Sequence, residues 1–229
     1  MMRRDIHRPG WPELIAGAVA FGILLVVIVV ALRAFPDNQP IAAGLTAFAF
    51  SALLGLGAFA AAVLLRIRRL EPFGVRRTSA RWIFAGLGLG VVAFALSLGV
   101  SIAYVTFSGD SQNVQGDYQS AAAGGVLAYL ATIVLGSIAT PIGEEFFWRG
   151  VVANFLGRYG AWVSVLGSAA LFAVAHGINP VLPVAFVVGV ITALLFRRTG
   201  SVWPGVAVHA VNNALSATLP LVVAAMLGS

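Results

Sequence analysis

The sequence predicts an all-α protein, a bundle of transmembrane helices that forms a single domain over residues 1–229. Sixty per cent of the residues are hydrophobic and only 10% are charged, whereas a typical soluble domain carries about 25% charge. Several apolar runs reach the roughly 20 residues that a helix needs to cross a bilayer. The chain contains no cysteine, which excludes disulfides, thiolate metal sites and a cysteine nucleophile.

Seven apolar runs predict seven membrane-spanning helices. The fourth is long for one crossing and contains Pro141, so we expect it to be kinked or tilted. The seventh contains Pro220, and a split there would raise the count to eight. The predicted spans cover residues 12–33, 41–65, 82–107, 121–156, 161–177, 181–196 and 202–227.

The basic residues predict how the bundle is oriented. The net charge is +6, and every basic residue is an arginine. The arginines gather before the first span and after the second, fourth and sixth, and in the other loops only Arg33 breaks this pattern. The positive-inside rule therefore places the N-terminus in the cytoplasm, and no nucleic-acid partner is expected from the charge. These cytoplasmic arginines are Arg3, Arg4, Arg8, Arg66, Arg68, Arg69, Arg76, Arg77, Arg81, Arg158, Arg197 and Arg198.

Few ionisable residues lie within the predicted spans. Such residues are costly in a bilayer and usually functional. Two asparagines, three and four residues after His209, add further polar groups. The set is Glu144, Glu145, Arg149, His176 and His209, with Asn212 and Asn213.

The two adjacent acids in PIGEEFFWRG (141–150) have different surroundings on a helix. Glu145 and Arg149 are four residues apart with the acid first, the better order for an ion pair. Glu144 is rotated by ~100° from Glu145, so it turns towards something else. We expect Pro141 and Gly143 to open the helix here and admit water.

Helix geometry predicts that four of these polar residues lie at one depth. At 1.5 Å per residue, Glu144 and His176 lie ~20 and ~22 Å from the cytoplasmic turn that joins their helices. His209 and Asn213 lie roughly 13 and 19 Å beyond the cytoplasmic turn before the last span. The four groups therefore form one layer inside the membrane, which we expect to be reached from the cytoplasm.

This set of groups suits hydrolysis by an activated water. A carboxylate in apolar surroundings is a candidate general base, and a histidine can share a water with it. A second imidazole with an amide four residues later can stabilise an oxyanion. No serine or threonine is evidently paired with a base, so water is the candidate nucleophile. The same histidines and glutamate could instead hold zinc.

Three motifs in this order resemble the signatures of a known family. EEFFWR (144–149) has the form EExxxR, FAVAH (172–176) the form FxxxH, and HAVNN (209–213) the form HxxxN. They resemble the CPBP family, which comprises CAAX prenyl proteases and bacteriocin-processing-type intramembrane endopeptidases and is also called Abi. The resemblance covers residues 121–217, a CPBP-like catalytic core. Trp148 stands where a Phe or Tyr is more usual.

The resemblance implies a hydrolase, an intramembrane protease that cuts a membrane-associated peptide or protein. It implies that one pair of residues activates the water and a second pair stabilises the oxyanion. Glu145 and Arg149 would form a supporting ion pair. The four implied catalytic residues are Glu144 and His176, which activate the water, and His209 and Asn213, which stabilise the oxyanion.

A metal-free mechanism is the expectation. The chain has no HExxH pair that would fix two ligands on one helical face. The alternative is a zinc ion held by Glu144, His176 and His209.

Two other functions stay open at this point. The buried groups could serve a proton-coupled transporter, although no repeat of the kind common in transporters is evident. The chain could also be a non-catalytic scaffold or immunity protein, but every motif residue is present. Eukaryotic relatives cut prenylated CAAX tails, whereas the compact, all-arginine, alanine-rich chain looks bacterial. The expected location is the plasma membrane, as a multi-pass protein.

Overall fold

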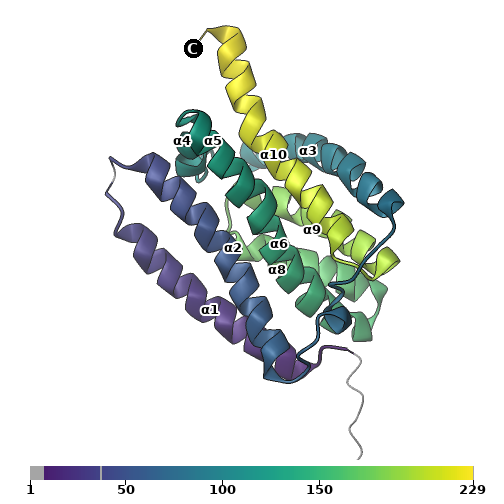
Figure 1. Ribbon diagram of the computed structural model, residues 1–229. Helices are drawn as coiled ribbons and strands as arrows, with labels where there is room; N and C mark the ends of the chain where they lie inside the picture. The colour runs from purple at the N-terminus through teal and green to yellow at the C-terminus, as the bar shows by residue number, and fades with distance from the viewer. Residues whose placement is uncertain (1–7, 37, 229) are drawn as a thin grey trace, which may run out of the picture.

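The computed structural model describes residues 8–36 and 38–228, and these form helices and loops without a β-strand. The helices lie side by side as a bundle (Figure 1). The predicted all-α fold is therefore confirmed. Arg3 and Arg4, which contribute to the predicted orientation, lie outside the described residues.

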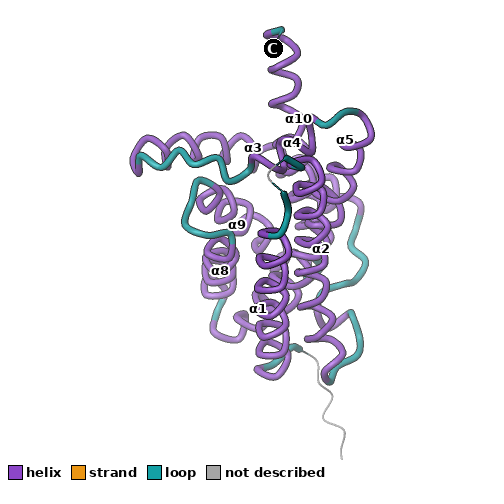
Figure 2. The backbone as a smooth tube through the Cα atoms, turned by 90° about the vertical axis from the view of Figure 1, so that its left-hand side faces the viewer, coloured by secondary structure: helices purple, strands orange, loops and turns teal. Residues whose placement is uncertain are grey.

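Three long helices make up the first part of the chain. The first two pack against each other, and the third packs on the last two helices of the chain. Figure 2 shows this third helix strongly inclined to the first two. They are α1 (Trp11–Arg33), α2 (Pro40–Leu65) and α3 (Ala80–Ser108), with a short 3₁₀ helix, η1 (Glu71–Phe73), between α2 and α3.

The predicted fourth span is broken near its beginning. A short helix, α4 (Gly116–Ala123), ends at Gly124–Gly125. Gly125 has φ +96°, a left-handed conformation that favours glycine and interrupts a helix. The prediction of one helix from residue 121 was therefore wrong, because the spanning helix runs over Val126–Tyr159.

The spanning helix alternates between α and π geometry. Pro141 lies in the first turn of one α segment, where it has no N–H to donate to the preceding turn. The π turns before it are the kind of irregularity that absorbs such a loss. The segments are α5 (Val126–Thr132), η2 (Ile133–Ala139), α6 (Thr140–Glu145), η3 (Phe146–Ala153), α7 (Asn154–Leu156) and η4 (Gly157–Tyr159).

Gly143 serves helix packing. A Cβ atom at Gly143 would lie 2.5 Å from the carbonyl oxygen of Ala52, and one at Gly55 would lie 2.3 Å from the carbonyl carbon of Gly143. The backbones of α2 and α6 therefore touch. Pro141 and Gly143 are both buried, and the expectation that they open the helix to water stays a prediction.

The last helices differ from prediction in length and continuity. Val163–Ala175, which includes η5 (Val163–Gly167) and α8 (Ser168–Ala175), is a short apolar helix. Its ~20 Å length is less than the roughly 30 Å hydrocarbon core. α9 (Val181–Thr199) and α10 (Trp203–Leu227) are long, and α10 continues through Pro220 without a split. Among the described residues, six helices are long and apolar enough to cross a membrane.

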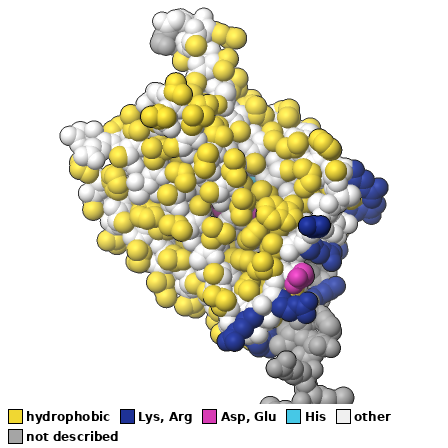
Figure 3. Space-filling view, viewed as in Figure 1, with side chains coloured by type: hydrophobic (Ala, Val, Ile, Leu, Met, Phe, Trp, Pro, Cys, Tyr) yellow, Lys and Arg dark blue, Asp and Glu magenta, His cyan; other side chains and the backbone are white. Residues whose placement is uncertain are grey.

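The arginines gather at one end of an apolar surface (Figure 3). This end holds the loop between α2 and α3 and the turn between α9 and α10. Here Arg66 donates to both carboxylate oxygens of Glu13, at 2.8 and 2.9 Å, and joins α1 to α2. The hydrogen bond to Glu13 raises the pKa of Arg66 above its already high usual value. We refer to this end as the arginine end.

Candidate active site inside the bundle

Glu145 and Arg149 form a fully buried ion pair between α6 and η3. The Nε atom of Arg149 lies 3.0 Å from Oε2 of Glu145, and both side chains have no exposed surface. The same Nε donates to the hydroxyl of Thr192 on α9 at 2.7 Å. A Cβ atom at residue 205 would come within 2.7 Å of Oε2 of Glu145, so Gly205 makes the room for this carboxylate. The predicted i, i+4 pair is confirmed.

Glu144 faces away from this pair, towards two histidines on other helices. Its Oε2 atom lies 3.4 Å from Nε2 of His209, and its Oε1 atom lies 3.9 Å from Nε2 of His176. His209 also has its Nδ1 atom 3.4 Å from Oε1 of Glu145. His209 therefore lies between the two carboxylates, and each imidazole faces a different oxygen of Glu144.

The ring of His176 is held by its own helix. Its Nδ1 atom lies 2.9 Å from the carbonyl oxygen of Phe172, so a proton on Nδ1 leaves Nε2 as an acceptor towards Glu144. The 3.9 Å gap between Nε2 and Oε1 is too long for a direct hydrogen bond. It is a separation that a bridging water can span.

Phe172, the first residue of the FxxxH motif, is a centre of this cluster. The centroid of its ring is 4.7 Å from that of His176 and 5.8 Å from that of His209, both edge-on. The Cζ atom of Arg149 lies 5.0 Å from the same ring centroid. One aromatic ring thus contacts both imidazoles and the buried guanidinium.

Asn213 is fixed from two sides. Its Nδ2 atom donates to the carbonyl oxygen of Gly136 at 3.0 Å, and its Oδ1 atom accepts from Nδ2 of Asn212 at 3.3 Å. Asn212 in turn accepts from the hydroxyl of Ser97 at 3.3 Å. In the sequence, only the place of Asn212 next to Asn213 signals that it orients the neighbouring amide.

One cavity of about 630 Å³ connects these groups. All four predicted catalytic residues, Glu144, His176, His209 and Asn213, contribute to its lining. Its walls come from α2, α3, α4, η2, α6, α8, α9 and α10, from the loop before α4 and from the residues between α8 and α9. The structure thus brings the four residues to the same space from three separate helices.

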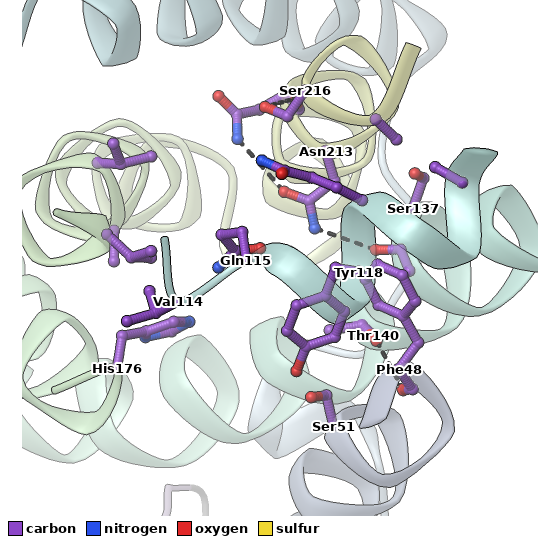
Figure 4. A pocket seen from close by; sticks show the side chains of 18 of the residues that line it. Phe48, Ser51, Val114, Gln115, Tyr118, Ser137, Thr140, His176, Asn213 and Ser216 are labelled. Carbon is purple, nitrogen blue, oxygen red and sulfur yellow. Dashed lines mark hydrogen bonds between the residues drawn. The ribbon is translucent and has the colours of Figure 1, made fainter. Parts of the chain in front are cut away.

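Two further polar side chains face this cavity, and sequence reasoning missed both. Figure 4 shows Tyr118 and Ser51 on the cavity wall, with His176 and Asn213 also pointing into it. Tyr118 belongs to α4 and Ser51 to α2, and both line the cavity. Burial raises the pKa of Tyr118, so its phenol stays a hydrogen-bond donor over the ordinary pH range.

The cavity lies towards the end of the bundle remote from the arginines. Its exposed lining residues come from the loop before α4, from α4 and from the C-terminal half of α10. The sequence predicted access from the cytoplasm, the side to which the positive-inside rule assigns the arginines, whereas the exposed lining lies at the opposite end of the bundle. These exposed lining residues are Gln112, Asn113, Val114, Gln119, Ala123, Ser216 and Pro220.

The residues that would hold a zinc ion are Glu144, His176 and His209. Within residues 8–36 and 38–228, no three histidine, aspartate or glutamate side chains are grouped as a metal site. The two imidazoles face different oxygens of Glu144, at 3.4 and 3.9 Å.

A comparison with known proteins identifies the segment that carries these motifs. Residues 126–215 match the family model described as Rce1-like, type II CAAX prenyl endopeptidase Rce1-like. This match confirms the resemblance to CAAX prenyl proteases drawn from the three motifs. No curated protein and no solved structure matches the chain.

Proposed function

We propose that this chain, with its Rce1-like segment, is an intramembrane endopeptidase that hydrolyses a peptide bond of a membrane-associated peptide or protein. The observation that carries the proposal is the meeting of Glu144 on α6, His176 after α8 and His209 on α10. Their facing atoms are 3.4 and 3.9 Å apart in a cavity large enough for a peptide segment. We place the protein in the plasma membrane of a bacterium.

The first step is activation of a water by Glu144 and His176. The 3.9 Å separation between Oε1 and Nε2 fits a water that donates one hydrogen to each atom. Glu144 takes a proton as the water oxygen attacks the scissile carbonyl carbon. The C=O double bond becomes a C–O⁻ single bond, and a tetrahedral intermediate forms.

The second step uses the groups on α10. Oε1 of Glu145 lies 3.4 Å from Nδ1 of His209, and a ring with a proton on both nitrogens would turn Nδ1–H to this carboxylate and Nε2–H into the cavity. Nε2–H of His209 and the second amide hydrogen of Asn213 are the donors we assign to the oxyanion. The C–N bond then breaks, and Glu144 returns its proton to the leaving amine. No step in this scheme needs a metal.

The proposal is tested on purified protein in detergent with a peptide library. We expect Glu144→Gln and His176→Ala to lower the hydrolysis rate by about 10²- to 10⁴-fold, the usual contribution of a general base. Glu71→Gln is the matched control, because Glu71 is an exposed carboxylate 3.6 Å from Arg69. Hydrolysis that is absent from the wild type, or unchanged in both site variants, would refute the proposal. Ion flux in liposomes that the same substitutions abolish would instead favour a transporter.

A further inference from the structure

We propose that the peptide reaches the site from the membrane face opposite to the arginine end, which is the extracytoplasmic face, and that its bound segment is uncharged. The peptide part of this inference rests on the proposed function. The route of access rests on the shape and charge of the bundle alone.

The arginine end of the bundle is closed. A layer of aromatic rings, the aromatic layer, lies between Glu144 and the arginine loops. Four of its rings are linked by centroid distances of 5.0 to 5.6 Å, and the other two form a pair 5.0 Å apart in the same buried cluster. The members of the aromatic layer are Phe59, Phe73, Phe146, Phe147, Trp148 and Trp203.

Hydrogen bonds tie the arginine loop over this layer. Arg76 donates from Nε to the carbonyl oxygen of Gly200 at 2.8 Å, and Ser201 donates from its hydroxyl to the carbonyl oxygen of Arg76 at 2.8 Å. Asn154 donates to the carbonyl oxygen of Pro72 at 2.8 Å. The loop between α2 and α3 is thereby fixed to α7 and to the turn before α10. None of these loop and turn residues lines the cavity.

The opposite end is open because one helix is short. The helix over Val163–Ala175 starts at the arginine end and stops at His176 after ~20 Å. The bundle therefore lacks a helix over the space beyond His176. The loop of residues 109–115, which we name the amide strap, covers part of this space.

The amide strap is ordered and carries neutral side chains at the cavity. Asn113 donates from Nδ2 to Oε1 of Gln119 at 2.9 Å, and its Oδ1 accepts from the backbone N–H of Gln115 at 3.2 Å. Gln112 and Gln115 also line the cavity, and no arginine among the described residues does so. Amide side chains can pair with peptide N–H and C=O groups, but they cannot neutralise a charged substrate side chain. Beside the amide strap, away from Glu144 and the two histidines, an uncharged segment is therefore the fitting occupant.

The positions of the arginines predict which side of the membrane each end of the bundle faces. Exposed arginines follow α2 and end α9, both at the closed end. The positive-inside rule places that end in the cytoplasm, and the amide strap consequently faces outwards.

Cysteine labelling tests the route directly, because the natural chain has no cysteine. Gln112→Cys places a thiol on the exposed amide strap, and Arg77→Cys places one at the exposed arginine end. Each variant is produced in sealed bacterial cells and treated with a charged, membrane-impermeant maleimide before and after permeabilisation. We expect Gln112→Cys to be labelled equally in both conditions. Arg77→Cys should be labelled at least about tenfold less in intact cells, since the charged reagent does not cross the bilayer. The reverse pattern, or labelling of Arg77→Cys in intact cells, would overturn the inference.

Sealed vesicles then test where the peptide is cut. A soluble, impermeant library of uncharged peptides is added to right-side-out and to inside-out vesicles. We expect hydrolysis to be at least about tenfold faster in right-side-out vesicles, and slower for matched peptides with a Lys or Asp at each position in turn. Faster hydrolysis in inside-out vesicles would overturn the inference. Absence of hydrolysis in both would refute the proposed function, whereas the labelling result would still decide the route.

Discussion

Removing the guanidinium of Arg149 would leave the carboxylate of Glu145 inside the bundle without a countercharge. Because both side chains are fully buried, we expect Arg149→Met to lower the free energy of unfolding by about 3–5 kcal/mol. The double variant Glu145→Gln/Arg149→Met removes both charges and should be more stable than Arg149→Met. Chemical unfolding in detergent measures both differences.

A surface pair provides the control for this experiment. Arg69 and Glu71 are 3.6 Å apart, with side chains 74% and 62% exposed. Arg69→Met should change the free energy of unfolding by at most about 1 kcal/mol. Equal losses for Arg69→Met and Arg149→Met would mean that burial of the Glu145–Arg149 pair has no energetic consequence, contrary to its contacts.

Phe172 positions both imidazoles, so its ring should affect turnover more than its size suggests. We expect Phe172→Leu to lower kcat about tenfold, because each edge-on aromatic contact contributes about 0.5–1.5 kcal/mol. The backbone carbonyl that His176 contacts remains in this variant. Phe186→Leu, on the exposed face of α9, is the matched control. An unchanged kcat for Phe172→Leu, or an equal fall for Phe186→Leu, would show that the ring only fills space.

The residues of the site could be predicted where their spacing along a single helix determined their position. The i, i+4 spacing predicted the pairing of Glu145 with Arg149, and the rise per residue predicted that Glu144 and His176 lie at one depth. Tyr118 was not predictable in this way, because its place at the cavity depends on how α4 folds back against α2. A contact between two helices does not produce a residue spacing that can be recognised in the sequence.

At the scale of the elements, the crossing of α2 and α6 positions Glu144, because Gly143 directly precedes it. We expect Gly55→Ala to lower the free energy of unfolding by about 1–3 kcal/mol, since the added Cβ would lie 2.3 Å from the backbone of Gly143. The displacement of α6 should also lower the hydrolysis rate. Thermal unfolding and peptide assays in detergent measure the two effects.

Gly99→Ala is the matched control for this crossing. A Cβ at Gly99 on α3 has no heavy atom within 4 Å, and alanine favours a helix over glycine by about 1 kcal/mol. Gly99→Ala should therefore keep or raise the stability. If Gly55→Ala were equally harmless, the close approach of α2 and α6 would not constrain the helix that carries Glu144.

Helices were predictable from apolar runs, but their interruptions were less so. The ends of α1, α2 and α3 lie within two residues of the predicted spans. The break at Gly124–Gly125 was missed because the hydropathy of the run continues across it. Pro220 suggested a split that α10 does not show, since one missing N–H can be tolerated within a long helix.

For the whole molecule, a closed arginine end and an open polar end face opposite sides of the membrane. Depth along each helix was predictable from the rise per residue. The open end was not, because it depends on where the short helix Val163–Ala175 stops and on how the aromatic layer fills the other end. The same motifs could therefore be reached from either face in bundles of opposite orientation, and the arginines decide between the two.

If arginines set this orientation, their removal should disturb it without changing the site. We expect neutralisation of four exposed arginines to reduce the free-energy preference for the orientation with the arginine end in the cytoplasm. The reduction should be roughly 4 kcal/mol, at about 1 kcal/mol for each charge near the cytoplasmic leaflet. In a Gln112→Cys background, external labelling of intact cells should then fall below that of the parent, because part of the population inserts the other way. The four changes are Arg69→Gln, Arg77→Gln, Arg197→Gln and Arg198→Gln.

Arg33→Gln provides the matched control, because it removes a positive charge from the end of α1 remote from the arginine end. That charge opposes the predicted orientation, so its removal should leave external labelling of Gln112→Cys complete. The labelled fraction after permeabilisation corrects each variant for its amount. Unchanged external labelling in the fourfold variant would mean that the helices themselves, and not the arginine end, determine which face of the membrane the cavity meets.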